Sequence, residues 1–299
     1  MVTLTNNQLT VKINTFGAEM SSVTDKKTGH EFVWQADEEF WARHAPVLFP
    51  IVGRLKDDKY EYEGQTYEMS QHGFARDSEF EVEEITEHSA IFSLKSSPET
   101  LEKYPFDFQL FIKYNLEENR LKVTYEVKNQ SDQEVMYYGI GGHPAFNVSQ
   151  TKNENGELEF DQVSYAVEPA GKYDSIPLTD DGFLRLEEKE TKDVSEEQLT
   201  HESFKGDAFI YKVHEDTQVI LKDEVKAVEI RVTPENMGHI GIWSTYPKRA
   251  GFVCVEPWAG LADAVNTSGN YAEKYGINKL EANETATHVY TLEFTKKIQ

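Results

Sequence analysis

Ionisable side chains recur in this sequence in short stretches where glycine, proline and aromatic residues interrupt apolar runs. His143 stands in "GGHPAFN", directly after the strand-like run "VMYY". The glycines remove side chains around the imidazole, and Pro144 favours an extended backbone at His143. A small molecule could therefore approach this ring at the end of a strand. Glycines at a strand end also form bulges and tight turns, and in that alternative the histidine only fills the gap.

Three further stretches share this pattern. Arg54 follows the proline-interrupted run "APVLFPIVG", His72 lies in "SQHGFARDSEF", and Glu256 follows four apolar residues in "GFVCVEPWAG". Burying a carboxylate is costly unless it is paired or used, and a position at a pocket rim resolves that cost. Each also has a structural alternative. Arg54 could brace a turn, His72 could bond within a turn, and Glu256 could pair with a surface cation.

Together these side chains suit acid and base chemistry on a hydroxylated ligand. A histidine with a pKa of about 6.5 can donate a proton near neutral pH, and a carboxylate with a pKa of about 4.3 can accept one. Opening and reclosing a cyclic hemiacetal needs a base for the anomeric hydroxyl and an acid for the ring oxygen. Aromatic residues could cover the apolar face of a sugar ring, although each is otherwise a core residue. The candidates are Phe74, Phe146, Phe209 and Trp258.

Composition limits the partners and the compartment. The 299 residues include 30 Lys and Arg against 53 Asp and Glu, a formal net charge of −23. A field of that sign repels phosphate, so nucleic acid and anionic membranes are poor partners. Cys254 is the only cysteine, and its apolar neighbours predict a buried side chain rather than a nucleophile. The sequence shows no signal-peptide pattern and no membrane-length apolar run, which predicts a soluble, cytoplasmic protein.

The elements that must position these side chains are predicted to be strands, because apolar residues alternate with period 2 along most of the chain. Alternating runs at 108–114 and 121–127 flank the turn-like "EEN" and predict a hairpin. Helical periodicity is limited to a turn or two near 37–46 and 195–204. The pattern predicts an all-β, antiparallel sandwich or barrel with few short helices. The charged segment 150–206 is expected to form long surface loops. Further alternating runs lie at 8–13, 59–69, 79–94, 227–233 and 287–294.

The ordered set of motifs resembles the aldose 1-epimerases, the galactose mutarotase-like proteins, and more narrowly their bacterial LacX-type branch. The motifs are "FPIVGRL", "QHGFAR", "GGHPAFN", "GDAFIY" and "VEPW", and the similarity runs from the first strand to the last. The resemblance implies a large antiparallel β-supersandwich in one domain spanning 1–299. It also implies interconversion of the α and β anomers of an aldose, without a metal or coenzyme.

The resemblance assigns roles to individual positions. Glu256 corresponds to the general base that takes the proton from the anomeric hydroxyl, and His143 to the general acid that protonates the ring oxygen. His72 matches the second histidine of the family, which helps to bind the sugar and polarise its ring oxygen. Arg54 and Asp207 match positions that hold sugar hydroxyls by hydrogen bonds.

The substrate and the assembly stay open at this level. A monosaccharide substrate and a monomeric or homodimeric state are expected. Mutarotases of hexose 6-phosphates need extra basic groups at the rim of the site, and the sequence does not place the available ones there. These are Arg76, Lys205, Lys248 and Arg249.

Three other functions remain as alternatives. His72, His143 and Glu256 could form a facial triad for iron, although no closely spaced His-x-Asp or His-x-Glu pair is present. Asp207 and Glu256 could serve a glycosidase, which would leave the histidines without a task. The protein could also bind carbohydrate without catalysis.

Overall fold

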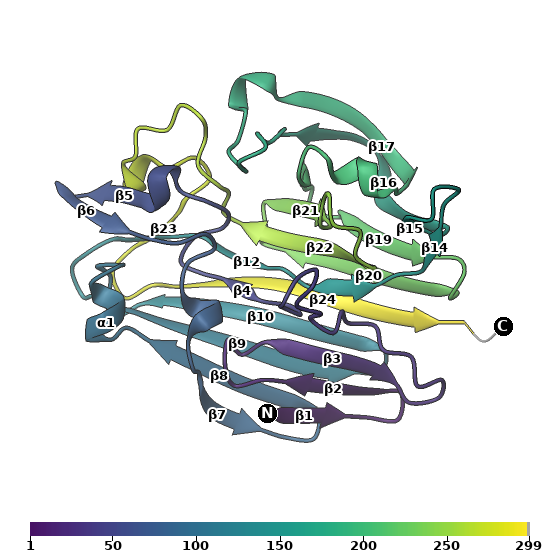
Figure 1. The fold of residues 1–299 in the computed structure, drawn as a ribbon. Coiled ribbons are helices and arrows are strands. Elements are labelled where there is room, and N and C mark those ends of the chain that lie inside the picture. Colours follow the sequence, from purple (N-terminus) through teal and green to yellow (C-terminus); the bar gives the residue numbers. More distant parts are fainter. Residues whose placement is uncertain (298–299) are drawn as a thin grey trace.

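The structure is a computed structural model that describes residues 1–297, and it is an antiparallel β protein (Figure 1). Strands hold 51% of the chain and helices 7%, which confirms the predicted all-β class. The main sheet has 15 strands, with β13 (Ala145–Asn147) paired to β22 and β17 (Glu190–Gln198) paired to β16 outside its linear path. That path runs through β4 (Val47–Leu48), β12 (Ile140–Gly142), β22 (Phe252–Ala259), β21 (His239–Trp243), β18 (Phe209–Lys212), β16 (Val163–Ser175), β19 (Gln218–Asp223), β20 (Val228–Glu235), β24 (Thr285–Lys296), β10 (Arg120–Asn129), β9 (Phe108–Glu117), β8 (Ser89–Lys95) and β7 (Glu81–Ile85).

Smaller sheets and short helices complete the fold. No helix within residues 1–297 is long and apolar enough to cross a bilayer. The small sheets are β1 (Val2–Thr5), β2 (Leu9–Ile13) and β3 (Met20–Asp25), then the pairs β5 (Lys59–Tyr62) with β6 (Gln65–Glu68), β11 (Met136–Tyr138) with β23 (Asn278–Leu280), and β14 (Gln150–Lys152) with β15 (Leu158–Phe160). The helices are α1 (Pro98–Leu101) and five 3₁₀ turns, η1 (Lys56–Asp58), η2 (Ala75–Asp77), η3 (Leu186–Glu188), η4 (His201–Phe204) and η5 (Tyr271–Glu273).

The predicted hairpin is the pair β9 and β10, which lies against the three-stranded N-terminal sheet. Alternate residues along both strands are buried, and the chain turns at Glu118 with a φ of 51°. The N-terminal sheet covers this region (Figure 1), and the Tyr114 hydroxyl of β9 donates to the Ala18 carbonyl at 2.7 Å. Apolar residues of both layers, such as Val11 and Ile112, belong to one buried core. This packing of one sheet on another is the sandwich that the alternation predicted.

The segment 150–206 differs from the prediction of long loops, because it carries β14 to β17 together with η3 and η4. In β16 the first five residues are buried, and its register runs along both β17 and β19. Strand β17 is mostly exposed and charged, with only Val194 buried. Backbone pairing with β16 therefore makes β17 a strand, and its side chains give no periodic apolar signal.

Candidate functional site

A cavity of about 790 Å³ lies over the part of the main sheet that contains β22, β21 and β18. Glu256 and Trp258 of β22 form part of its wall, together with Trp243 of β21. His143, His72 and Asp207 also line it, so residues from all five motifs, far apart in the sequence, share one cavity. A cavity of this size accommodates a small-molecule ligand.

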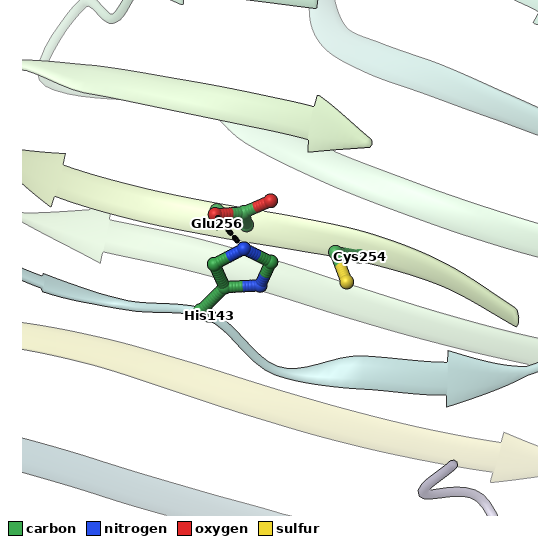
Figure 2. Close-up of side chains that lie close together, drawn as sticks. All are labelled: His143, Cys254 and Glu256. Carbon is green, nitrogen blue, oxygen red and sulfur yellow. Dashed lines mark ion pairs between the residues drawn. The ribbon is translucent and has the colours of Figure 1, made fainter. Parts of the chain in front are cut away.

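The sheet register brings His143 and Glu256 together. On one side of His143, Gly141 of β12 lies opposite Trp258, and on the other side Ala145 of β13 lies opposite Cys254. The same register therefore continues across the break between β12 and β13, which places His143 opposite Glu256. Residues directly opposite each other in an antiparallel pair point to the same face. Figure 2 shows the result, with His143 Nε2 at 3.2 Å from Glu256 Oε2.

Aromatic rings enclose the His143 imidazole. The ring stacks on Trp41 with centroids 4.9 Å apart, and the edges of Trp243 and His72 meet it at 5.5 Å and 5.6 Å. Burial first, and then the nearby charge of Arg76, lower the pKa of His143 to about 3. The imidazole is therefore neutral over the physiological range in the empty site.

The pKa of Glu256 is shifted in the opposite direction. Its side chain is 1% exposed within β22, and burial raises its pKa well above the usual range. The negative charge of Asp207 adds to this rise, while the Trp258 indole acts against it. Burial thus raises the proton affinity of the carboxyl and lowers that of the imidazole, which suits a pair that exchanges protons with one ligand.

Polar atoms at this point of the cavity lack hydrogen-bond partners. Within residues 1–297, Glu256 Oε2, His143 Nδ1 and Trp258 Nε1 are buried and form no hydrogen bond. The 3.2 Å contact between His143 Nε2 and Glu256 Oε2 is therefore a close approach that is not aligned as a hydrogen bond. Arg76 Nε, also on a lining residue, is a fourth such unpaired atom. Buried polar groups are usually paired, so this group of unpaired atoms indicates a site built for a polar ligand.

His72 is held in one tautomer by Gly53. Its backbone N–H donates to the Gly53 carbonyl at 2.8 Å, and its Nδ1 accepts the Gly53 N–H at 3.0 Å. Burial lowers the pKa of His72 well below its usual value, and Coulombic interactions with His143 and then with Arg76 act in the same direction. A neutral ring that accepts at Nδ1 carries its hydrogen on Nε2. His72 can therefore donate from Nε2, which no hydrogen bond within residues 1–297 uses.

Of the two residues expected to bind sugar hydroxyls, only Asp207 lines the cavity. Asp207 lines the cavity, and burial raises its pKa. Arg54 is not among the lining residues; its Nε is buried without a hydrogen-bond partner within residues 1–297. Its charge nevertheless opposes the rise in the Asp207 pKa. Hydroxyl binding by Arg54 therefore stays a prediction.

The aromatic candidates are only partly correct. Trp258 lines the cavity, whereas Phe146 is fully buried in the core and Phe74 and Phe209 pack against that core. The sequence reasoning did not select Trp41 and Trp243, which do line the cavity. Their available signal was the grouping of tryptophan with basic residues and proline in "FWARHAP" and "IWSTYPK".

Three of the four basic residues named as rim candidates line the cavity. Arg76, Lys205 and Lys248 line the cavity, while Arg249 instead forms an ion pair with Glu159 at 2.7 Å. A further basic lining residue, Arg43, was not selected from the sequence.

The family follows from comparison of the whole chain with known proteins. The model of the family described as aldose 1-epimerase matches residues 1–293. The chain belongs to the aldose 1-epimerase family.

Individual relatives of this aldose 1-epimerase family member agree with that assignment. Protein LacX of Lactococcus lactis subsp. lactis is 32% identical, with 97% of this chain and 98% of LacX covered. The structure of a galactose mutarotase related enzyme from Lactobacillus acidophilus superposes with a TM-score of 0.91 and 39% identity, covering 99% of this chain and 97% of that one. A galactose mutarotase-like protein from Lactobacillus casei ATCC 334 gives a TM-score of 0.90 and 31% identity, covering 99% and 100%. These relatives confirm the galactose mutarotase-like fold.

Three side chains at this site lie close enough together to bind one metal ion. The donor atoms of His143, Cys254 and Glu256 all lie within 4.8 Å of one another (Figure 2). This group contains Cys254 in place of His72, so it differs from the iron triad considered from the sequence.

Proposed function

We propose that this protein is an aldose 1-epimerase, a mutarotase that opens and recloses the ring of an aldose by proton transfer alone. The observation that carries the proposal is the buried His143–Glu256 pair, with Nε2 and Oε2 3.2 Å apart in the wall of a sugar-sized cavity. Membership of the family supports the reaction class.

Ring opening removes a proton from the anomeric hydroxyl and adds one to the ring oxygen. One member of the pair therefore has to act as a base and the other as an acid. Burial favours the free site with the proton on Glu256 and a neutral His143. Moving that proton to Nε2, 3.2 Å away, produces the carboxylate and the imidazolium; because burial sets the two pKa values in the opposite order, the bound sugar has to align the pair and favour its charged form. Glu256 then takes the anomeric hydroxyl proton while His143 gives its proton to the ring oxygen. The bond between C1 and the ring oxygen breaks, and C1 becomes a carbonyl.

Reclosure reverses these transfers after rotation about the bond between C1 and C2. The proton on Glu256 returns to the carbonyl oxygen, and neutral His143 takes the proton back from the ring hydroxyl, which attacks either face of C1. His72, which can donate from Nε2, is suited to a hydrogen bond to the ring oxygen. Asp207 and Arg54 are suited to sugar hydroxyls.

Polarimetry tests this proposal. We expect the protein to accelerate the optical rotation change of freshly dissolved α-glucose or α-galactose, or of their 6-phosphates. Glu256→Gln and His143→Asn should each lower kcat by about a hundredfold or more, the usual loss for an acid or base. Glu81→Gln changes an exposed carboxylate on the distant edge strand β7 and serves as the matched control.

Two results would contradict the proposal. One is a rate equal to that of buffer with all four sugars. The other is sugar binding that survives Glu256→Gln while the wild-type protein leaves anomer exchange unchanged, which identifies a non-catalytic carbohydrate-binding protein.

A phosphorylated aldose is the second candidate substrate, because four basic side chains line the same cavity. Three of them are already engaged: Arg43 and Arg76 approach Asp77 at 2.9 Å and 3.7 Å, and Lys248 donates to the Glu39 carbonyl at 2.6 Å. The fourth, Lys205, is exposed, and no side-chain bond of Lys205 occurs within residues 1–297. Among the described residues, Lys205 is thus the basic side chain of the cavity wall without a bound partner.

Kinetics with paired substrates separates the two candidates. If the substrate is phosphorylated, kcat/KM for glucose 6-phosphate should exceed that for glucose. Lys205→Ala should then raise KM for the phosphorylated sugar alone, whereas Lys212→Ala, on the exposed end of β18, should not. Equal kcat/KM values for the two sugars in the wild-type protein would exclude this candidate.

A further inference from the structure

Cys254 lies beside the proton-transfer pair, but the proposed reaction does not use it. Cys254 and Glu256 are two residues apart on β22, so their side chains point to the same face of the sheet (Figure 2). The sulfur, a ring nitrogen of His143 and a carboxylate oxygen of Glu256 lie within 4.8 Å of one another, and all three residues are buried. The unpaired Glu256 Oε2 is an available ligand atom at this point.

We propose that His143, Cys254 and Glu256 form a binding site for a thiophilic divalent cation of the Zn²⁺ type, and that its occupancy blocks mutarotation. The blocking part rests on the proposed function, because the cation would occupy both proton-transfer groups. The binding part stands on the ligand geometry alone.

The geometry fits a tetrahedral cation. Bonds of about 2.0 Å to nitrogen or oxygen and about 2.3 Å to sulfur place tetrahedral ligand atoms roughly 3.3–3.6 Å apart. His143 Nε2 and Glu256 Oε2 already lie 3.2 Å apart. The sulfur lies at most 4.8 Å from the other two donor atoms, so metal binding requires it to move by about 1 Å. His143 and Glu256 both line the cavity, which can supply water or a sugar hydroxyl as a fourth ligand.

Charge also favours this class of cation. A thiolate and a carboxylate carry two negative charges, which cancel those of a divalent cation and leave a neutral cluster in the buried wall. The thiol proton, and the carboxyl proton where Glu256 holds one, go to solvent on binding, so affinity rises with pH. Asp207 adds attraction, and Arg43 and Arg76 oppose it. The sulfur ligand selects Zn²⁺ over Mg²⁺ or Ca²⁺, which require oxygen ligands.

Metal titration of the chelator-treated full-length protein tests binding. We expect Zn²⁺ to bind with one-to-one stoichiometry in calorimetry, and Co²⁺ to give a thiolate-to-cobalt charge-transfer band. In Cys254→Ala the band should disappear and Zn²⁺ should bind about a hundredfold more weakly, since a direct ligand matters at least as much as an outer partner, whose loss costs about 10–100-fold. Cys254→Ser, a nearly isosteric change, repeats the test if the alanine variant folds poorly. An unchanged Zn²⁺ affinity in a folded variant, or Co²⁺ binding without the band, would overturn the site.

Activity measurements test blocking separately. Zn²⁺ should inhibit anomer exchange by the wild-type protein, a chelator should restore the rate, and Mg²⁺ should have no effect. Cys254→Ala should keep the basal rate and lose the inhibition. Loss of activity on chelation would refute blocking, because the cation would then be a required cofactor. If Zn²⁺ binds as expected but no sugar is turned over, the proposed function fails while the metal site stands.

Discussion

Replacing Asp263 with asparagine should destabilise the protein by about 3–5 kcal/mol, the cost of leaving one member of a buried ion pair without its partner. Lys274 Nζ lies 3.2 Å from Asp263 Oδ1, and both side chains are 4% exposed. Asparagine keeps an oxygen for the Lys56 N–H, which Asp263 Oδ2 accepts at 3.0 Å. The change therefore removes the negative charge with little loss of shape.

This free-energy change translates into a thermal shift. An unfolding entropy of about 2.1 cal/mol/K per residue gives roughly 0.6 kcal/mol/K for a chain of this length. A loss of about 3–5 kcal/mol then lowers the unfolding midpoint by about 5–8 °C. Circular dichroism during heating and urea titration of the same variant measure the two quantities independently.

The pH dependence gives a second signature of the same pair. Burial lowers the pKa of Lys274, and Asp263 acts against that change, so the asparagine variant should lower it further. A lysine whose pKa is lower in the folded state binds fewer protons there, so stability rises with pH up to the unfolded pKa of about 10.4. The deficit of Asp263→Asn should therefore shrink between about pH 7 and pH 10.

The double variant Asp263→Asn with Lys274→Met is the control. It removes the unpaired ammonium and should recover most of the lost stability, because the buried charge causes most of the cost. The reasoning is refuted if Asp263→Asn unfolds within about 1 °C of the wild type, or if the double variant is no more stable than the single one.

Two further predictions concern the residues around His143 and His72. Gly53→Ala should lower both stability and kcat/KM, because Gly53 has a φ of +73° and an added Cβ would lie 2.6 Å from the Ala262 Cβ. Adding Ala262→Gly to this variant should restore part of the activity measured by polarimetry. Full activity of Gly53→Ala would contradict the role of this turn in holding His72. The ring signals of His143 and His72, followed by NMR during a pH titration, should show no titration step near pH 6.5, because burial lowers the pKa of His143 to about 3 and that of His72 well below 6.5. A step centred there for either ring would show that this ring is not shielded as the structure indicates.

Side-chain alternation predicts those strands that bury one face. The hairpin β9 and β10 was recognisable because each strand contributes alternate residues to the core. The same rule fails for β17, where eight of nine residues are exposed or half-buried and pairing with β16 defines the strand. Such a strand depends on a partner that local sequence does not identify.

At the site too, the sequence indicated some residues and missed others. Glu256 and His143 stand out in the sequence because a polar residue inside an apolar, glycine- and proline-containing run needs an explanation. Trp41 and Arg43 lie in the segment between β3 and β4, which contains no regular element, so no helix forms within 37–46, where helical turns were expected. Only the tertiary fold places this segment over the imidazole, so its residues were not predicted as part of the site.

The glycines before His143 have a different task from the one that the sequence first indicates. They were interpreted as clearing space for a ligand, but their missing side chains make room for protein. A Cβ at Gly141 would lie 2.7 Å from Trp258 Cδ1, and one at Gly142 would lie 2.9 Å from the Tyr290 hydroxyl. Gly141 thus allows β12 to pair closely beneath the Trp258 indole, and this pairing sets the register that places His143 opposite Glu256. The glycines therefore serve the reaction through the position of the imidazole, and the space for the ligand is provided by the wall of Trp41, Trp243 and Trp258.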